Sequence, residues 1–365
     1  MTTRLASIDL LRTVAIVTMV LVHFGENLSG YTPPLAGLGA PLFIFLSGAS
    51  YFLWSDALLS RGADVTDVTR VSVRRGLFIF GAGVAFNVLV WLPEDVFNWD
   101  VLTFIGSALV LLAFVRRLQL SIVVLMAVVS ALMAPILRQM ASYPEYWESG
   151  YFECDLTLSD VLIGYFATGY FPLFPWIALS LAGYATGSWL FARSPTAGAG
   201  VSRPVRTAWI GLSLVMVSIA LLASRPLLGG PIVAGMLGGW TMFPPTTEYV
   251  IGMLGTAVAL LSLGHRFVDP VAASGRFERV VGAARTFSSY SLTIYVVHHG
   301  VHLWPLWIYG FAKTGEPTSH WMLAMPPGLS LALGAAFLVV CFLTLRALGP
   351  RRAFGFEALM RWICD

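Results

Sequence analysis

The sequence contains few charged residues and almost no lysine. Only 11% of its 365 residues are Asp, Glu, Lys or Arg, whereas 57% are hydrophobic, and the mean hydropathy is +0.79. This composition excludes a water-soluble protein of this length and indicates a polytopic membrane protein. Lys313 is the single lysine, so arginine carries nearly all of the basic charge. The net charge of +3 says little by itself, and the distribution of the charges is more informative.

Cysteine is also scarce. Cys154, Cys341 and Cys364 fall in separate segments, so the sequence predicts neither a disulfide framework nor a cysteine-based metal site. The first apolar segment carries charged residues and lacks a small-residue cleavage site, so we expect it to remain as a membrane span. No segment is large enough for a separate soluble domain. We therefore expect a single integral membrane domain over residues 1–365.

Apolar runs of about 17–22 residues recur along the chain, which indicates helical spans rather than barrel strands. Arginines gather in the loops on one side and acidic residues in those on the other, a pattern that places both termini in the cytoplasm. Two further apolar stretches, 161–170 and 227–243, are expected to re-enter or to lie at the outer surface. We predict an all-α bundle of about ten transmembrane helices, at residues 7–25, 35–54, 76–92, 99–115, 118–137, 171–192, 207–224, 247–264, 288–310 and 327–347.

The first apolar segment places ionisable groups inside a helix of membrane length, where charge is costly and by default marks function. Arg12 and His23 are separated by ten residues, so they share one helical face, roughly 16 Å apart along the axis. We expect Asp9, one turn earlier, to fix the Arg12 guanidinium by a paired hydrogen bond. Arg12 is then suited to bind phosphate groups that enter from the cytoplasm. The alternative is an anchor to lipid phosphate.

His23 is the candidate general base, because imidazole serves that purpose near neutral pH. Glu26 follows one turn later and is expected to orient the ring, or to contact the substrate. The alternative for His23 is an interfacial side chain that only hydrogen-bonds a loop.

A second group of histidines lies late in the chain. His298 and His302 are four residues apart and share a helical face, whereas His299 is expected to point elsewhere. The spacing could hold a metal, but no cysteine and few carboxylates are at hand to complete the site, so we expect no metal. Tyr295 and His298 are instead expected to pair with the site around His23, with His302 contacting the substrate. The alternative is a structural contact between helices.

Two further stretches carry candidate features. In residues 39–54, Gly39, Gly48 and Ala49 allow close helix packing, and Ser47 could donate a hydrogen bond to a developing oxyanion. This stretch could equally be a plain packing helix. The outer loop 138–160 is rich in aromatic and acidic residues, typical either of an interfacial belt or of a platform for a sugar ring.

Four stretches of the chain resemble the heparan-α-glucosaminide N-acetyltransferase family within the transmembrane acyltransferase superfamily. They lie at residues 4–23, 40–48, 171–184 and 291–298. The spacing of Arg12 and His23 is also similar to the signature of the acyltransferase-3 family. His23 matches the family histidine, Arg12 and Asp9 match the polar start of the motif, and His298 matches the histidine of the late helix. Thr13 departs from the usual glycine, and the animal members carry Asn where His23 stands.

The resemblance implies a many-helix protein that takes an acetyl or other short acyl group from cytoplasmic acyl-coenzyme A. The acceptor is a glycan hydroxyl or amine on the other side of the membrane. We thus predict a multi-pass acyltransferase of the cytoplasmic membrane, with His23, His298 and Asp9 as catalytic residues and Arg12 and Ser47 at the coenzyme. Its expected partners are membrane lipid, acyl-CoA and the acceptor, without nucleic acid; a homodimer stays open. The alternatives are a transporter or flippase of an envelope precursor, and a non-catalytic subunit of an envelope-synthesis complex.

Overall fold

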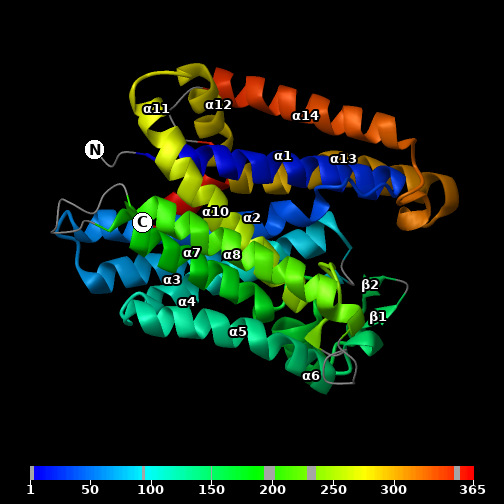
Figure 1. The fold of residues 1–365 in the computed structure, drawn as a ribbon. Helices are drawn as coiled ribbons and strands as arrows, with labels where there is room; N and C mark the ends of the chain where they lie inside the picture. Colours follow the sequence, from blue (N-terminus) through cyan, green and yellow to red (C-terminus); the bar gives the residue numbers. More distant parts are fainter. Residues whose placement is uncertain (1–3, 93–94, 149, 193–201, 228–235, 349–353) are drawn as a thin grey trace.

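The computed structural model describes residues 4–92, 95–148, 150–192, 202–227, 236–348 and 354–365. Over these residues the protein is a bundle of helices with one short antiparallel hairpin, which confirms the predicted all-α fold (Figure 1). The longer helices are α1 (Ala6–Ser29), α2 (Gly39–Leu59), α3 (Val65–Val90), α4 (Val101–Val115), α5 (Leu120–Met140), α7 (Leu173–Phe191), α8 (Ser202–Ser224), α10 (Thr247–Leu263), α12 (Glu278–Ser289), α13 (Ser291–Thr314) and α14 (Pro327–Ala347).

Short elements connect these helices and close the ends of the bundle. They are η1 (Ala36–Leu38), η3 (Tyr143–Tyr146), β1 (Trp147–Glu148), β2 (Tyr151–Phe152), α6 (Leu158–Ile163), the π-helices η4 (Gly164–Thr168) and η6 (Gly264–Val268), η5 (Arg225–Leu227), α11 (Asp269–Ala273), η7 (Pro317–His320) and α15 (Phe356–Cys364). In the hairpin, Trp147 faces Phe152 and Glu148 faces Tyr151. The hairpin lies at the end of the bundle opposite α11 and α12 (Figure 1).

Each of the ten predicted spans coincides with a helix, but fewer are long and apolar enough to cross a membrane. Within the described residues, seven helices meet that requirement, and the bent pair Leu158–Thr168 and Leu173–Phe191 raises the number to eight. The other two predicted spans are α4, which has only 15 residues, and α13, whose three histidines lower its hydropathy. Stretch 161–170 forms the short arm of the bent pair, at an angle of 44° to α7. Residues 228–235 of stretch 227–243 lie outside the described residues.

Close helix packing surrounds the middle of α2. A Cβ added at Gly48 would lie 2.0 Å from the carbonyl oxygen of Ser180, and one added at Gly183 would lie 1.9 Å from that of Phe45. The backbones of α2 and α7 therefore touch, as the small residues of α2 predicted. On another side α2 packs against α1, where a Cβ added at Gly39 would lie 3.3 Å from the carbonyl oxygen of Ala15. Ile16 and Val20 of α1 are fully buried.

Candidate functional site

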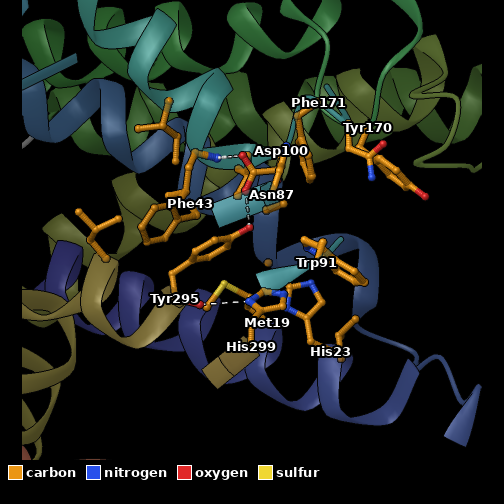
Figure 2. Close-up of a pocket in the computed structure, with 18 of the residues that line it drawn as sticks. Met19, His23, Phe43, Asn87, Trp91, Asp100, Tyr170, Phe171, Tyr295 and His299 are labelled. Atoms are coloured by element: carbon orange, nitrogen blue, oxygen red, sulfur yellow. Dashed lines mark hydrogen bonds between the residues drawn. The ribbon is translucent and has the colours of Figure 1, made fainter. Parts of the chain in front are cut away.

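One large cavity runs through the bundle alongside α1. Its volume is about 1160 Å³, and α1, α2, α3, α4, α13 and the β1–β2 hairpin all contribute to its wall. Arg12 and Asn27 of α1 both line it. Fifteen residues of helix rise by about 22 Å, so the cavity extends over most of a membrane thickness. Figure 2 shows its central part.

Arg12 lines one end of the cavity and is held by serines. Its Nη1 donates to Ser288 Oγ at 2.9 Å, and its Nη2 donates to Ser50 Oγ at 2.5 Å. The guanidinium therefore bridges the end of α12 and the middle of α2. Arg75 of α3 lines the same end, where it pairs with Asp365 and stacks on Trp54 at 4.7 Å.

Asp9 does not hold Arg12, contrary to our sequence prediction. Its carboxylate accepts two hydrogen bonds from Arg4, at 2.7 and 2.9 Å, and is 2% exposed. Arg4 precedes α1, and from there its planar guanidinium reaches both oxygens of Asp9 at once. Arg4 also donates to Ser289 at 2.8 Å. Asp9 thus ties the start of α1 to α12 and acts on Arg12 only by its charge.

His23 meets two histidines of α13 in the middle of the cavity. Its Nδ1 lies 2.9 Å from His298 Nε2, with the two rings stacked. The centroid of the His299 ring lies 4.4 Å from that of His23. The prediction that His299 points elsewhere is therefore wrong, because the imidazole from α1 reaches the face of α13 between positions 298 and 299. His299 lines the cavity beside His23 (Figure 2).

Backbone carbonyls fix the tautomers of the histidines on α13. Nδ1 of His298 lies 2.9 Å from the oxygen of Ile294, and Nδ1 of His299 lies 3.1 Å from that of Tyr295. A carbonyl oxygen only accepts, so each Nδ1 donates, and a neutral imidazole then keeps a lone pair on Nε2. His298 Nε2 must accept from His23 Nδ1. The lone pair of neutral His23 consequently lies on Nε2, the nitrogen that a general base needs.

His302 is occupied by structural contacts. Its Nδ1 donates to the carbonyl oxygen of His298 at 2.6 Å, and its Nε2 lies 2.9 Å from Asn27 Nδ2. Trp321 Nε1 donates to Oδ1 of Asn27 at 3.1 Å. Since both ring nitrogens already have partners, the predicted contact of His302 with substrate is not supported by this arrangement, and His302 instead orients α13 against α1.

Sequence reasoning missed two polar residues of the cavity, Asp100 and Asn87. Asp100 caps α4, accepting from the backbone nitrogens of Leu102 and Thr103 at 3.1 Å, and its other oxygen accepts from Tyr295 at 3.0 Å (Figure 2). Asn87 is fully buried, and its Oδ1 has no partner among the described residues. The sequence contained features that could have identified both residues: Asn87 is a polar residue inside a predicted span, and Asp100 directly precedes an apolar run.

The other predicted site residues also reach the cavity. Ser47, Glu26 and Tyr295 all line it. Ser47 Oγ donates to the carbonyl oxygen of Ile44 at 2.7 Å, so its hydroxyl proton is directed at its own helix. The hydrogen bond that orients His23 comes from His298 rather than from Glu26.

Aromatic and acidic residues line the end of the cavity opposite Arg12. Tyr151 of the hairpin packs on Trp321 with ring centroids 5.0 Å apart, Trp321 packs on Trp91 at 5.8 Å, and Trp91 lies 6.0 Å from His299. The loop 138–160 therefore contributes directly to the cavity wall. The acidic residues that line this end are Glu26, Asp95 and Glu153.

The sequence matches one family model, described as heparan-alpha-glucosaminide N-acetyltransferase, catalytic, over residues 4–218. No curated protein matches the chain. The matched region includes Arg12 and His23 and ends before α13. Because it covers more than half of the chain, it shows the family and supports a membrane N-acetyltransferase-type function. The protein is a member of the heparan-α-glucosaminide N-acetyltransferase catalytic family and contains several helices of membrane-spanning length.

Proposed function

We propose that the protein moves an acetyl or other short acyl group from cytoplasmic acyl-coenzyme A to a glycan hydroxyl or amine outside the cytoplasmic membrane. The main support for this proposal is one continuous cavity that Arg12, His23 and the β1–β2 hairpin all line. A donor and an acceptor that come from opposite sides of a membrane need such a continuous path. The reacting atoms would then meet beside His23.

Arg12 and Arg75 make one end of the cavity suitable for the phosphates of coenzyme A. An arginine bound to serine hydroxyls keeps its charge and gains a fixed orientation, and guanidinium donors match phosphate oxygens well. The long pantetheine arm would follow α1 from Arg12, so that the thioester lies near His23. Arg70 and Arg74 in the first turns of α3, together with Arg117 just after α4, support a cytoplasmic location for this end.

His23 Nε2 takes the proton from the acceptor hydroxyl or amine in this mechanism. The acceptor oxygen or nitrogen attacks the thioester carbonyl carbon, a new C–O or C–N bond forms, and the C–S bond breaks. The protonated His23 then returns the proton to the leaving thiolate, which departs as the thiol of coenzyme A. His298 holds the His23 ring through Nδ1 and stabilises its charged form, as the third member of a catalytic triad does.

The acceptor end suits a sugar. Pyranose rings present C–H faces that pack on aromatic side chains, and Tyr151, Trp321 and Trp91 form such a wall. Glu26 and Glu153 line the same end and could accept hydrogen bonds from hydroxyl or amino groups.

Acetyl transfer by purified protein in nanodiscs tests the proposal directly. Radiolabelled acetyl-CoA is the donor, and free glucosamine, which offers both an amine and hydroxyls, is the acceptor probe. We expect labelled product, and we expect His23→Ala to lower the rate by about 10²–10⁴-fold, the usual contribution of a general base. His320→Ala is the matched control, because His320 is a half-buried histidine of η7 that does not line the cavity. Retained acetyl-CoA binding shows that the variant is folded; full activity of folded His23→Ala would refute the mechanism.

A further inference from the structure

We propose that His23, His298 and His299 form a binding site for a divalent transition metal, with Zn²⁺ as the best fit. The ligand nitrogens of the three residues lie within 4.8 Å of one another. From the sequence we considered only His298 and His302 as a metal-binding pair and expected no metal; in the structure His302 is bound to Asn27. A convergence of imidazoles from two helices is therefore a feature of the tertiary structure.

The distances between these nitrogens suit a tetrahedral ion after small side-chain movements. In such a site the Zn–N bonds measure about 2.0–2.1 Å, so neighbouring ligand nitrogens lie about 3.4 Å apart. His23 Nδ1 and His298 Nε2 are 2.9 Å apart and would separate slightly. The third nitrogen, from His299, would move inward.

The surroundings of the two α13 histidines are those of metal ligands. Metal-binding imidazoles usually donate their second ring N–H to a carbonyl or carboxylate, which fixes the tautomer and directs the lone pair at the ion. His298 and His299 donate Nδ1–H to backbone carbonyls in this way. They are 0% and 1% exposed, so they are held before any ion arrives.

The fourth coordination position opens onto the cavity. Three imidazoles and one exchangeable water are the donor set of open zinc sites, and imidazole also binds Cu²⁺ and Ni²⁺. Asp100 accepts a hydrogen bond from Tyr295, whose ring packs on His299, so a carboxylate lies close to the proposed ion and offsets part of the cost of a buried cation.

Metal binding would change His23. When Nδ1 becomes a ligand, its proton must move to Nε2, so the ring no longer offers a lone pair there and no net proton is released. An occupied site is thus an inhibited state of the proposed transferase. The metal site itself stands on the histidine geometry alone, whether or not the protein transfers acyl groups.

Binding of Zn²⁺ and Co²⁺ to the purified, chelator-stripped full chain tests the inference. We expect one Zn²⁺ per chain in competition with a chromophoric chelator, and an intense visible absorption band of tetrahedral Co²⁺. His299→Ala and His298→Ala should each weaken binding by more than about 100-fold, because even the loss of a hydrogen-bond partner of a metal ligand costs about 10–100-fold in affinity. His265→Ala, at the far end of the bundle, should leave binding unchanged. Circular dichroism and a monodisperse elution profile report the fold of each variant.

Three results would overturn the inference. They are the absence of stoichiometric Zn²⁺ binding by the unaltered protein, binding that is equally strong in both folded cluster variants, and a Co²⁺ spectrum of octahedral aquo type. Transfer activity is not part of this test, so its outcome is independent of whether the acyltransferase proposal holds.

Discussion

His23 Nδ1 donates to His298 Nε2 across 2.9 Å, although 275 residues of chain separate them. The family match ends at residue 218, so it includes the first of these residues and not the second. The candidate base and the group that orients it thus come from two different regions of the protein, and only the candidate base lies in the matched region.

Replacing His298 should slow transfer without preventing donor binding. In His298→Leu, the N–H of His23 loses its acceptor inside the protein, and a buried donor without a partner costs about 1–3 kcal/mol. If that cost falls on the charged form of His23, kcat drops about tenfold or more, whereas KM for acetyl-CoA stays constant. Initial-rate kinetics measure both constants. An unchanged kcat in a folded variant would show that His298 does not assist His23.

Replacing Arg12 should affect the donor rather than the chemical step. Arg12→Gln removes a charged donor near the proposed phosphate position, and hydrogen bonds to charged groups contribute about 1.5–3 kcal/mol. KM for acetyl-CoA should therefore rise about 10–100-fold, with a smaller effect on kcat. Arg4→Gln is the matched control, since Arg4 pairs with Asp9. It should lower stability and leave KM unaltered; a rise in KM equal to that of Arg12→Gln would contradict the assignment.

Gly48→Ala should destabilise the bundle strongly. The added methyl group would lie 2.0 Å from a carbonyl oxygen of α7, so α2 and α7 must move apart, and overpacking of this kind costs about 1–3 kcal/mol or more. Gly282→Ala in α12 is the control, because nothing lies within 4 Å of its added Cβ. Thermal unfolding in detergent should show a lower midpoint only for Gly48→Ala. Equal midpoints would mean that the helices adjust freely.

Cys154 reports the side of the membrane on which the hairpin lies. Burial raises the pKa of its thiol, with smaller contributions from the carboxylates of Asp160 and Asp155. A membrane-impermeant maleimide added outside intact cells should therefore label Cys154 slowly at neutral pH and faster as the pH rises and the thiolate forms. Cys154→Ser should abolish this external labelling. Labelling of Cys154 only after the cells are opened would reverse the assigned orientation.

Much of the fold could be predicted, because hydropathy is a local property. A run such as 327–347 is apolar throughout, and the structure places α14 at those residues. α13 shows the limit of this reasoning: its helix is long, but three histidines reduce its hydropathy below that of a typical span. Hydropathy therefore locates helices better than it decides which of them cross the membrane.

The candidate site was less predictable, because side-chain partners depend on tertiary packing. Helical spacing correctly placed Arg12 and His23 on one cavity. It could not reveal that Arg4, from outside the helix, occupies the carboxylate of Asp9. Nor could it predict that the His299 ring lies beside His23, because that contact depends on how α1 packs against α13.

The distance in sequence between α1 and α13 has a consequence for biosynthesis. α1 enters the membrane before α13, and the His23 imidazole lacks its ring partner until translation has advanced by the 275 positions to His298. A ribosome product that stops short of α13 would expose an unsatisfied polar group in lipid, which favours its removal by quality-control proteases. Chains that stop before α13 should consequently be both inert and short-lived, so the cell would gain the His23–His298 pair only from chains that extend through α13.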